Sequence, residues 1–73
     1  MENKFQKMLE QASDLAEDQE YEEALLLYDK ILESAPKHIP ALLDKAATLQ
    51  RMGKNSQSFQ IYNTILKEDS NNL

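Results

Sequence analysis

Hydrophobic residues recur at intervals of three and four along this chain, which is the spacing of one face of an α-helix. The pattern is interrupted three times, so it predicts four amphipathic helices, covering approximately residues 4–17, 21–34, 39–52 and 55–68. Because the connections between them are short, consecutive helices are expected to run antiparallel. The sequence therefore predicts an all-α fold built from two antiparallel helical hairpins.

The interruptions contain residues that end helices. Pro36 prevents the second helix from continuing, because proline lacks an amide hydrogen and clashes with the preceding turn. Pro40 lies near the start of the third helix, where proline is well tolerated. Gly53 follows the third helix and can adopt the left-handed backbone conformation that commonly ends one.

The chain also repeats itself with a period of 34 residues. Apolar residues match across this shift, while the polar positions vary. Small residues match as well, which predicts that paired helices approach closely at those positions. The matched pairs include Leu9/Leu43, Ala12/Ala46, Leu15/Leu49, Ala24/Ser58, Leu25/Phe59, Tyr28/Tyr62, Ile31/Ile65 and Leu32/Leu66. We therefore expect two copies of one hairpin, stacked so that each covers apolar surface of the other.

These residues resemble the tetratricopeptide repeat, whose unit is a helical hairpin of this length. The first copy reads Met8-x-x-Gln11-Ala12-x-x-Leu15, then Glu20-Tyr21-x-x-Ala24-x-x-x-Tyr28-x-x-Ile31, then Pro36. The second reads Leu42-x-x-Lys45-Ala46-x-x-Leu49, then Gly53-Lys54-x-x-x-Ser58-x-x-x-Tyr62-x-x-Ile65, then Ser70. The resemblance implies one domain over residues 1–73, with repeats at 5–38 and 39–72, forming a fragment of a right-handed superhelix. The first copy departs from the family pattern at Gln19, where a glycine is usual.

The resemblance also implies a function. Proteins of this family are scaffolds or adaptors that bind a peptide or helix of a partner protein on a shallow concave groove, lined by the first helix of each repeat. By that analogy, the binding residues would be Gln6, Leu9, Ser13, Ala16, Leu43, Ala47, Gln50 and Arg51. One subgroup binds carboxylate termini through lysine and asparagine. The corresponding positions here hold Leu9, Ser13 and Asp44, so that activity is not expected.

Composition and charge argue against several classes of function. The chain has no cysteine and a formal charge of −5, with nine acidic and three basic residues in 5–38. The first unit would therefore repel nucleic acid, whose binders normally carry a basic stripe. No apolar run is long enough to cross a membrane. We find no catalytic, phosphate-binding or metal-binding motif, so the sequence predicts no enzyme activity, no cofactor and a cytoplasmic protein.

Two features could suggest other chemistry. His38 is the single histidine, and without companion ligands it is expected to be an ordinary surface residue in a turn. The acidic run 18–23 lacks the glycine of a calcium loop. It is expected to interact with the positive end of the second helix dipole, with contact to a basic partner as the alternative.

The last helix carries an apolar face that nothing in the sequence covers, formed by Phe59, Tyr62, Ile65 and Leu66. Two repeats are fewer than the roughly three usually needed for independent stability. Leu73 matches Ile39, the first residue of the second unit. Two alternatives to a monomeric adaptor therefore remain open: a homodimer formed through the last helix, and a fragment of a longer repeat array.

Overall fold

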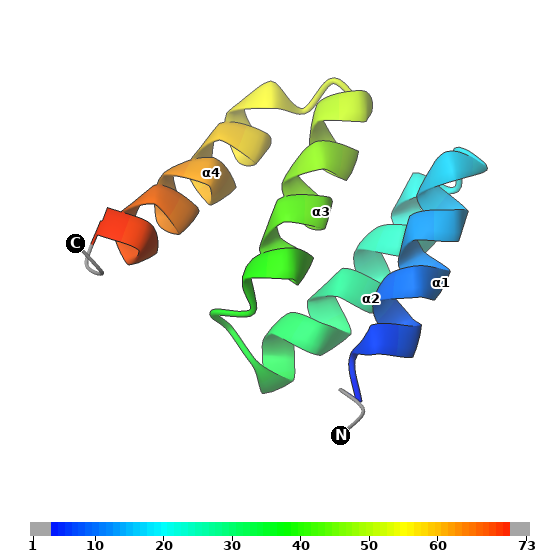
Figure 1. The fold of residues 1–73 in the computed structure, drawn as a ribbon. Coiled ribbons are helices and arrows are strands. Elements are labelled where there is room, and N and C mark those ends of the chain that lie inside the picture. Colours follow the sequence, from blue (N-terminus) through cyan, green and yellow to red (C-terminus); the bar gives the residue numbers. More distant parts are fainter. Residues whose placement is uncertain (1–3, 71–73) are drawn as a thin grey trace.

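The computed structural model describes residues 4–70, with side chains described for residues 4–68. These residues form four helices and no strand: α1 (Gln6–Glu17), α2 (Tyr21–Ser34), α3 (Ile39–Arg51) and α4 (Asn55–Ser70). The helices follow one another as two antiparallel hairpins, which confirms the predicted fold class (Figure 1). The helix α4 extends two residues beyond the predicted end, because neither proline nor glycine stops it there. Leu73, the residue that matches Ile39, lies outside the described residues.

The two hairpin turns have the same geometry. In each turn, the first residue beyond the helix cap has a left-handed backbone, with φ of 66° at Gln19 and 82° at Gly53. The amide of the next residue then donates to a carbonyl near the end of the preceding helix, at 2.8 Å for Glu20 N to Leu15 O and 2.9 Å for Lys54 N to Leu49 O. This is the hydrogen-bond pattern of a Schellman motif. The two turns are 34 residues apart, so the sequence period is also a period of the backbone.

The connection between the hairpins is built differently. His38 precedes α3, and its Nδ1 accepts a hydrogen bond from the amide of Ala41 at 3.3 Å. Its ring also contacts Phe5 edge-on, with the ring centroids 5.3 Å apart. His38 is therefore half-buried and caps a helix, whereas the sequence predicted a surface residue. Pro40 occupies the first turn of α3, as expected.

The core of the first hairpin is centred on small side chains. Ala12 and Ala24 are fully buried, and Ala16 and Tyr28 pack with them. The equivalent small residues of the second hairpin are also buried: Ala46 is inaccessible and Ser58 is 3% exposed. The small residues that match across the repeat are therefore buried in both hairpins, in keeping with the prediction that paired helices pack together at these positions.

The helices α2 and α3 hold the two hairpins together. Lys45 of α3 forms an ion pair with Asp29 of α2, at 2.7 Å between Nζ and Oδ1. A second ion pair joins Lys37 to Glu68 of α4 at 3.5 Å. Because these side chains are partly solvated, each ion pair contributes at most about 1 kcal/mol. Tyr28 and Ile31 of α2 are nearly inaccessible to solvent, and burial of side chains of this size contributes more free energy than either ion pair.

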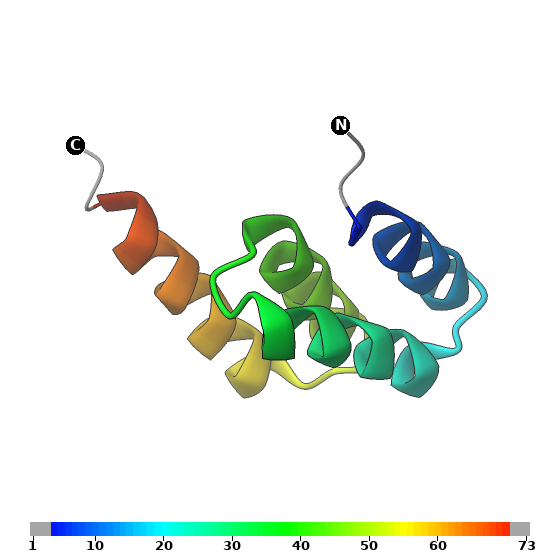
Figure 2. The same cartoon turned by 90° about the horizontal axis from the view of Figure 1, so that it is seen from below.

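The molecule is a thin slab of 37 × 35 × 17 Å. Seen from below, α1 and α3 lie on one side, with α2 beneath them (Figure 2). The helix α4 forms one edge of the slab and contacts only α3 among the described helices. Within residues 4–70, no helix combines the length and apolar character needed to span a bilayer.

Candidate functional site: a groove between α1 and α3

The helices α1 and α3 contact each other only slightly and leave a small groove between them. Its volume is about 80 Å³, and it is open to solvent on one side. The residues that line the groove come from the facing sides of the two helices and from one position of α2. They are Ser13, Ala16, Glu17, Tyr28, Asp44, Ala47, Thr48 and Arg51.

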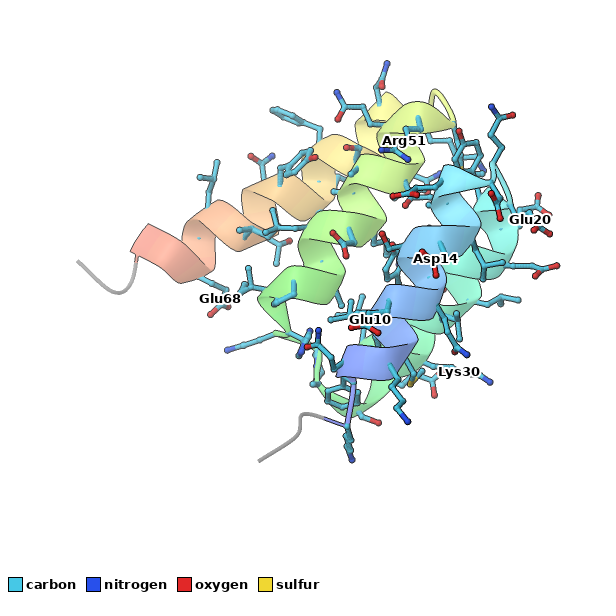
Figure 3. The ribbon with its side chains drawn as sticks, turned by 45° about the vertical axis from the view of Figure 1, so that its right-hand side comes forward. Glu10, Asp14, Glu20, Lys30, Arg51 and Glu68 are labelled. Carbon is cyan, nitrogen blue, oxygen red and sulfur yellow. The ribbon has the colours of Figure 1, made fainter. Side chains whose placement is uncertain are left out.

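Residues at equivalent positions of the 34-residue repeat line the two sides of this groove. Ser13 and Glu17 of α1 are equivalent to Ala47 and Arg51 of α3, so each helix presents the same face to the groove. Asp44 is equivalent to Glu10, which lies one turn before Ser13 on α1. Figure 3 shows Glu10 on α1 and Arg51 at the C-terminal end of α3. Carboxylates therefore occupy the same repeat position on both helices.

Asp44 is the most distinctive ionisable residue of the groove. Its side chain is half-buried, and burial raises the pKa of its carboxyl above the usual value of 3.8. Within residues 4–68, the carboxylate forms no ion pair and no side-chain hydrogen bond. The hydrogen bond at this residue is made by its backbone carbonyl, which accepts from Thr48 Oγ1 at 2.9 Å. Asp44 therefore presents a partly desolvated negative charge to whatever enters the groove.

Tyr28 forms the floor of the groove and is 1% exposed. Its pKa is raised by burial and by the negative charge of Asp44. The Thr48 hydroxyl and the positive charge of Arg51 act in the opposite direction on the Tyr28 pKa. Tyr28 remains neutral at physiological pH, so it adds no charge to the groove.

The sequence-based set of binding residues separates into two groups. Four of its members line the groove together: Ser13, Ala16, Ala47 and Arg51. The other four lie outside the lining. Leu9 packs half-buried against the core, Leu43 is 43% exposed, and Gln6 is exposed and donates to Glu10 Oε2 at 3.3 Å. Gln50 lies instead at the junction of α3 and α4.

Glu17, Tyr28, Asp44 and Thr48 line the groove but are absent from the sequence-based set. A signal for Glu17 was available, because it is the repeat equivalent of Arg51, which the set includes. Tyr28 carried no such signal. It belongs to the second helix of its hairpin and reaches the groove through the gap between α1 and α3.

The apolar face predicted for the last helix, formed by Phe59, Tyr62, Ile65 and Leu66, lies on α4. Phe59 is 65% exposed and Leu66 is 62% exposed, while Tyr62 and Ile65 are half-buried. A hollow of about 180 Å³ lies beside this face, lined by Gln50, Asn55, Ser58, Phe59 and Tyr62.

The acidic turn forms a third surface, where Glu22 and Glu23 occupy the first turn of α2, as predicted for residues that interact with the helix dipole. A hollow of about 370 Å³ at this turn is lined by residues 19–23 and Met52.

Two stacked helical hairpins with turns of the same geometry define a helical-repeat protein, and the open groove between the first helices of the two hairpins is a surface to which both hairpins contribute. The family model described as tetratricopeptide repeat matches residues 15–72, which include all of α2, α3 and α4, and the chain belongs to that family. No curated protein and no solved structure matches the chain. Tetratricopeptide repeats generally mediate protein–protein interactions and are typically not enzymes.

Proposed function

We propose that this protein is an interaction scaffold that binds a segment of a partner protein in the groove between α1 and α3. The repeats would be residues 5–38 and 39–72, because the two Schellman turns fall at equivalent places in these ranges. The observation that carries the proposal is the unpartnered, half-buried carboxylate of Asp44 in a groove shared by both hairpins. The family's general role in protein interactions supports it.

The charged residues of the groove indicate which charge a partner segment should carry. Glu17 and Asp44 line it, and Arg51 is the single cation of the lining. A partner carboxylate would be repelled by Asp44. A lysine or arginine side chain of the partner would instead stabilise the ionised carboxylate of Asp44, which burial in the groove destabilises. Leu43, exposed next to Asp44, would supply an apolar contact to the same segment.

The partner is therefore proposed to be a peptide segment that carries a basic side chain beside apolar residues. Ser13, Ala16, Ala47 and Arg51 would contact it from the groove. Gln6, Leu9 and Gln50 would contribute only if the segment extends beyond the groove.

A pair of synthetic probes tests this proposal. Two capped, fluorescently labelled nine-residue peptides with the same leucine and alanine residues would carry either lysines or glutamates at the remaining positions. Fluorescence anisotropy should show binding of the lysine peptide and none of the glutamate peptide. Equal affinity for both peptides, or preference for the glutamate peptide, would contradict the proposed partner chemistry.

Two variants with the same change in net charge separate the groove from the general field of the protein. Asp44→Asn should weaken binding of the lysine peptide at least about tenfold, because a hydrogen bond to a charged group is worth about 1.5–3 kcal/mol. Glu33→Gln, at an exposed position of α2 outside the groove, should change it less than about twofold. Similar losses in both variants would show that binding is not localised in the groove.

A further inference from the structure

The apolar face of α4 is more exposed to solvent than the equivalent face of α2. On α2, Tyr28 is 1% exposed and Leu32 is half-buried, because α3 packs against this helix. The repeat equivalents on α4 are the half-buried Tyr62 and Leu66, which is 62% exposed. No other described helix contacts α4 besides α3, and Figure 1 shows α4 at the edge of the molecule. The face has the composition of a packed surface, and no second helix among residues 4–70 covers it.

The charge pattern points to the kind of partner that fits. Residues 55–66 of α4 contain no charged residue, and this is the longest uncharged run in a chain with 21 charged side chains and a net charge of −5. Two copies of an acidic protein repel each other, so they associate most favourably through a surface without charge. The α4 face satisfies that condition for a second copy of this chain.

A second copy could meet α4 end to end or through a symmetric pairing, and the repeat disfavours the end-to-end arrangement. In an end-to-end array, α1 of the next copy would cover α4 as α3 covers α2. Thr48 of α3 is buried beside Tyr28, and its repeat equivalent on α1 is Asp14. An end-to-end arrangement would therefore bury the Asp14 carboxylate beside Tyr62, which is unfavourable without a compensating cation.

We propose that two copies of the protein associate symmetrically through α4, with the two α4 helices antiparallel. The antiparallel orientation opposes the helix dipoles. It also places Lys54, at the start of one α4, near the C-terminal end of the other, whereas a parallel pair would bring the two Lys54 residues together. In this arrangement, Phe59 of each copy lies against Leu66 of the other, and the hollow beside Phe59 and Tyr62 receives that leucine. The interface is separate from the α1–α3 groove and does not depend on its function.

Sedimentation equilibrium of the full chain tests the association. The apparent mass should rise from the monomer value of 8.4 kDa towards twice that value between about 10 µM and about 1 mM protein. A wild-type protein that stays at 8.4 kDa throughout this range would overturn the proposal, since some other occupant would then have to cover α4.

A charge exchange tests the orientation. Phe59→Glu and Leu66→Lys should each weaken association at least tenfold, because each places a charge against an apolar side chain. The double variant should recover much of this loss through two symmetric Glu–Lys pairs, and its association should be salt-sensitive, unlike that of the wild type. Failure of the double variant to associate more tightly than either single variant would refute the antiparallel pairing.

Two controls keep this test specific. Gln57→Glu adds the same charge on the opposite side of α4 and should leave the mass distribution unchanged. Far-UV circular dichroism should show wild-type helicity in every variant, since Phe59 and Leu66 are mostly exposed. If a charged variant loses helicity, Phe59→Gln and Leu66→Gln replace the single variants, and retention of wild-type association by both would count against the interface.

Discussion

The difference in coverage between α2 and α4 leads to a prediction that uses one substitution at two equivalent positions. Ile31 and Ile65 occupy the same place in the two hairpins. Ile31 is fully buried, whereas Ile65 is only half-buried. Replacing each with alanine removes the same three carbon atoms from two different environments, so the two losses of stability report directly on how completely each helix is covered.

The magnitudes follow from burial. Three fully buried carbon groups at about 0.8 kcal/mol each give about 2.4 kcal/mol of lost transfer free energy for Ile31→Ala. The remaining cavity raises the total to about 3–4 kcal/mol. For Ile65→Ala, about half of the transfer free energy is at stake and solvent can enter the space, so we expect about 1 kcal/mol. A domain of this size has a total stability of about 4–11 kcal/mol, so Ile31→Ala should leave it marginally folded.

Urea unfolding followed by circular dichroism measures both losses. The experiment is best done at the lowest workable protein concentration, so that association through α4 does not contribute. We expect the unfolding midpoint to fall much further for Ile31→Ala than for Ile65→Ala, with similar slopes. Equal losses at the two positions would refute the conclusion that α3 covers α2 while the equivalent face of α4 stays open.

Three further predictions concern single residues. Asp44→Asn should stabilise the protein at neutral pH. Burial raises the folded-state pKa of Asp44, so the unfavourable charge is present above that pKa and absent below the usual value of 3.8; thermal melts should therefore show a gain that disappears at strongly acidic pH. His38→Ala should cost about 0.5–2 kcal/mol in urea unfolding, because α3 loses its N-terminal cap and Phe5 loses a ring contact, and an unchanged midpoint would show that neither contact matters. Gln19→Gly should raise the free energy of unfolding by up to about 1 kcal/mol, since Gln19 holds a left-handed backbone that glycine adopts without strain; a lower free energy of unfolding would contradict that geometry.

Much of the fold follows from residues with strong local preferences. Pro36 and Gly53 fix where helices end, and apolar residues at helical spacing fix which faces pack. The repeat adds the long-range information that a single hairpin lacks, because Ala12 and Ala46 must mark the same kind of close contact. Gln19 shows the limit of residue preference. Its left-handed backbone is imposed by the hairpin turn and not by the residue itself.

The groove was less predictable than the fold. Its walls follow from the repeat, but its floor depends on how far apart α1 and α3 lie, which no local pattern encodes. Tyr28 is visible in the sequence only as a packing residue, and its place beneath the groove depends on the angle between the hairpins. The capping role of His38 was missed for a similar reason, since its ring is positioned partly by Phe5, 33 residues earlier in the sequence.

A residue-resolved titration tests the central claim most directly, namely that the groove between α1 and α3 is the binding surface. The amide resonances of ¹⁵N-labelled protein would be followed by NMR while the lysine peptide is added. We predict that the largest shifts fall at Ser13, Ala16, Ala47 and Arg51, on the facing sides of the two helices. Shifts confined to α4 or to the acidic turn at residues 19–23, with the groove amides unmoved, would contradict the account.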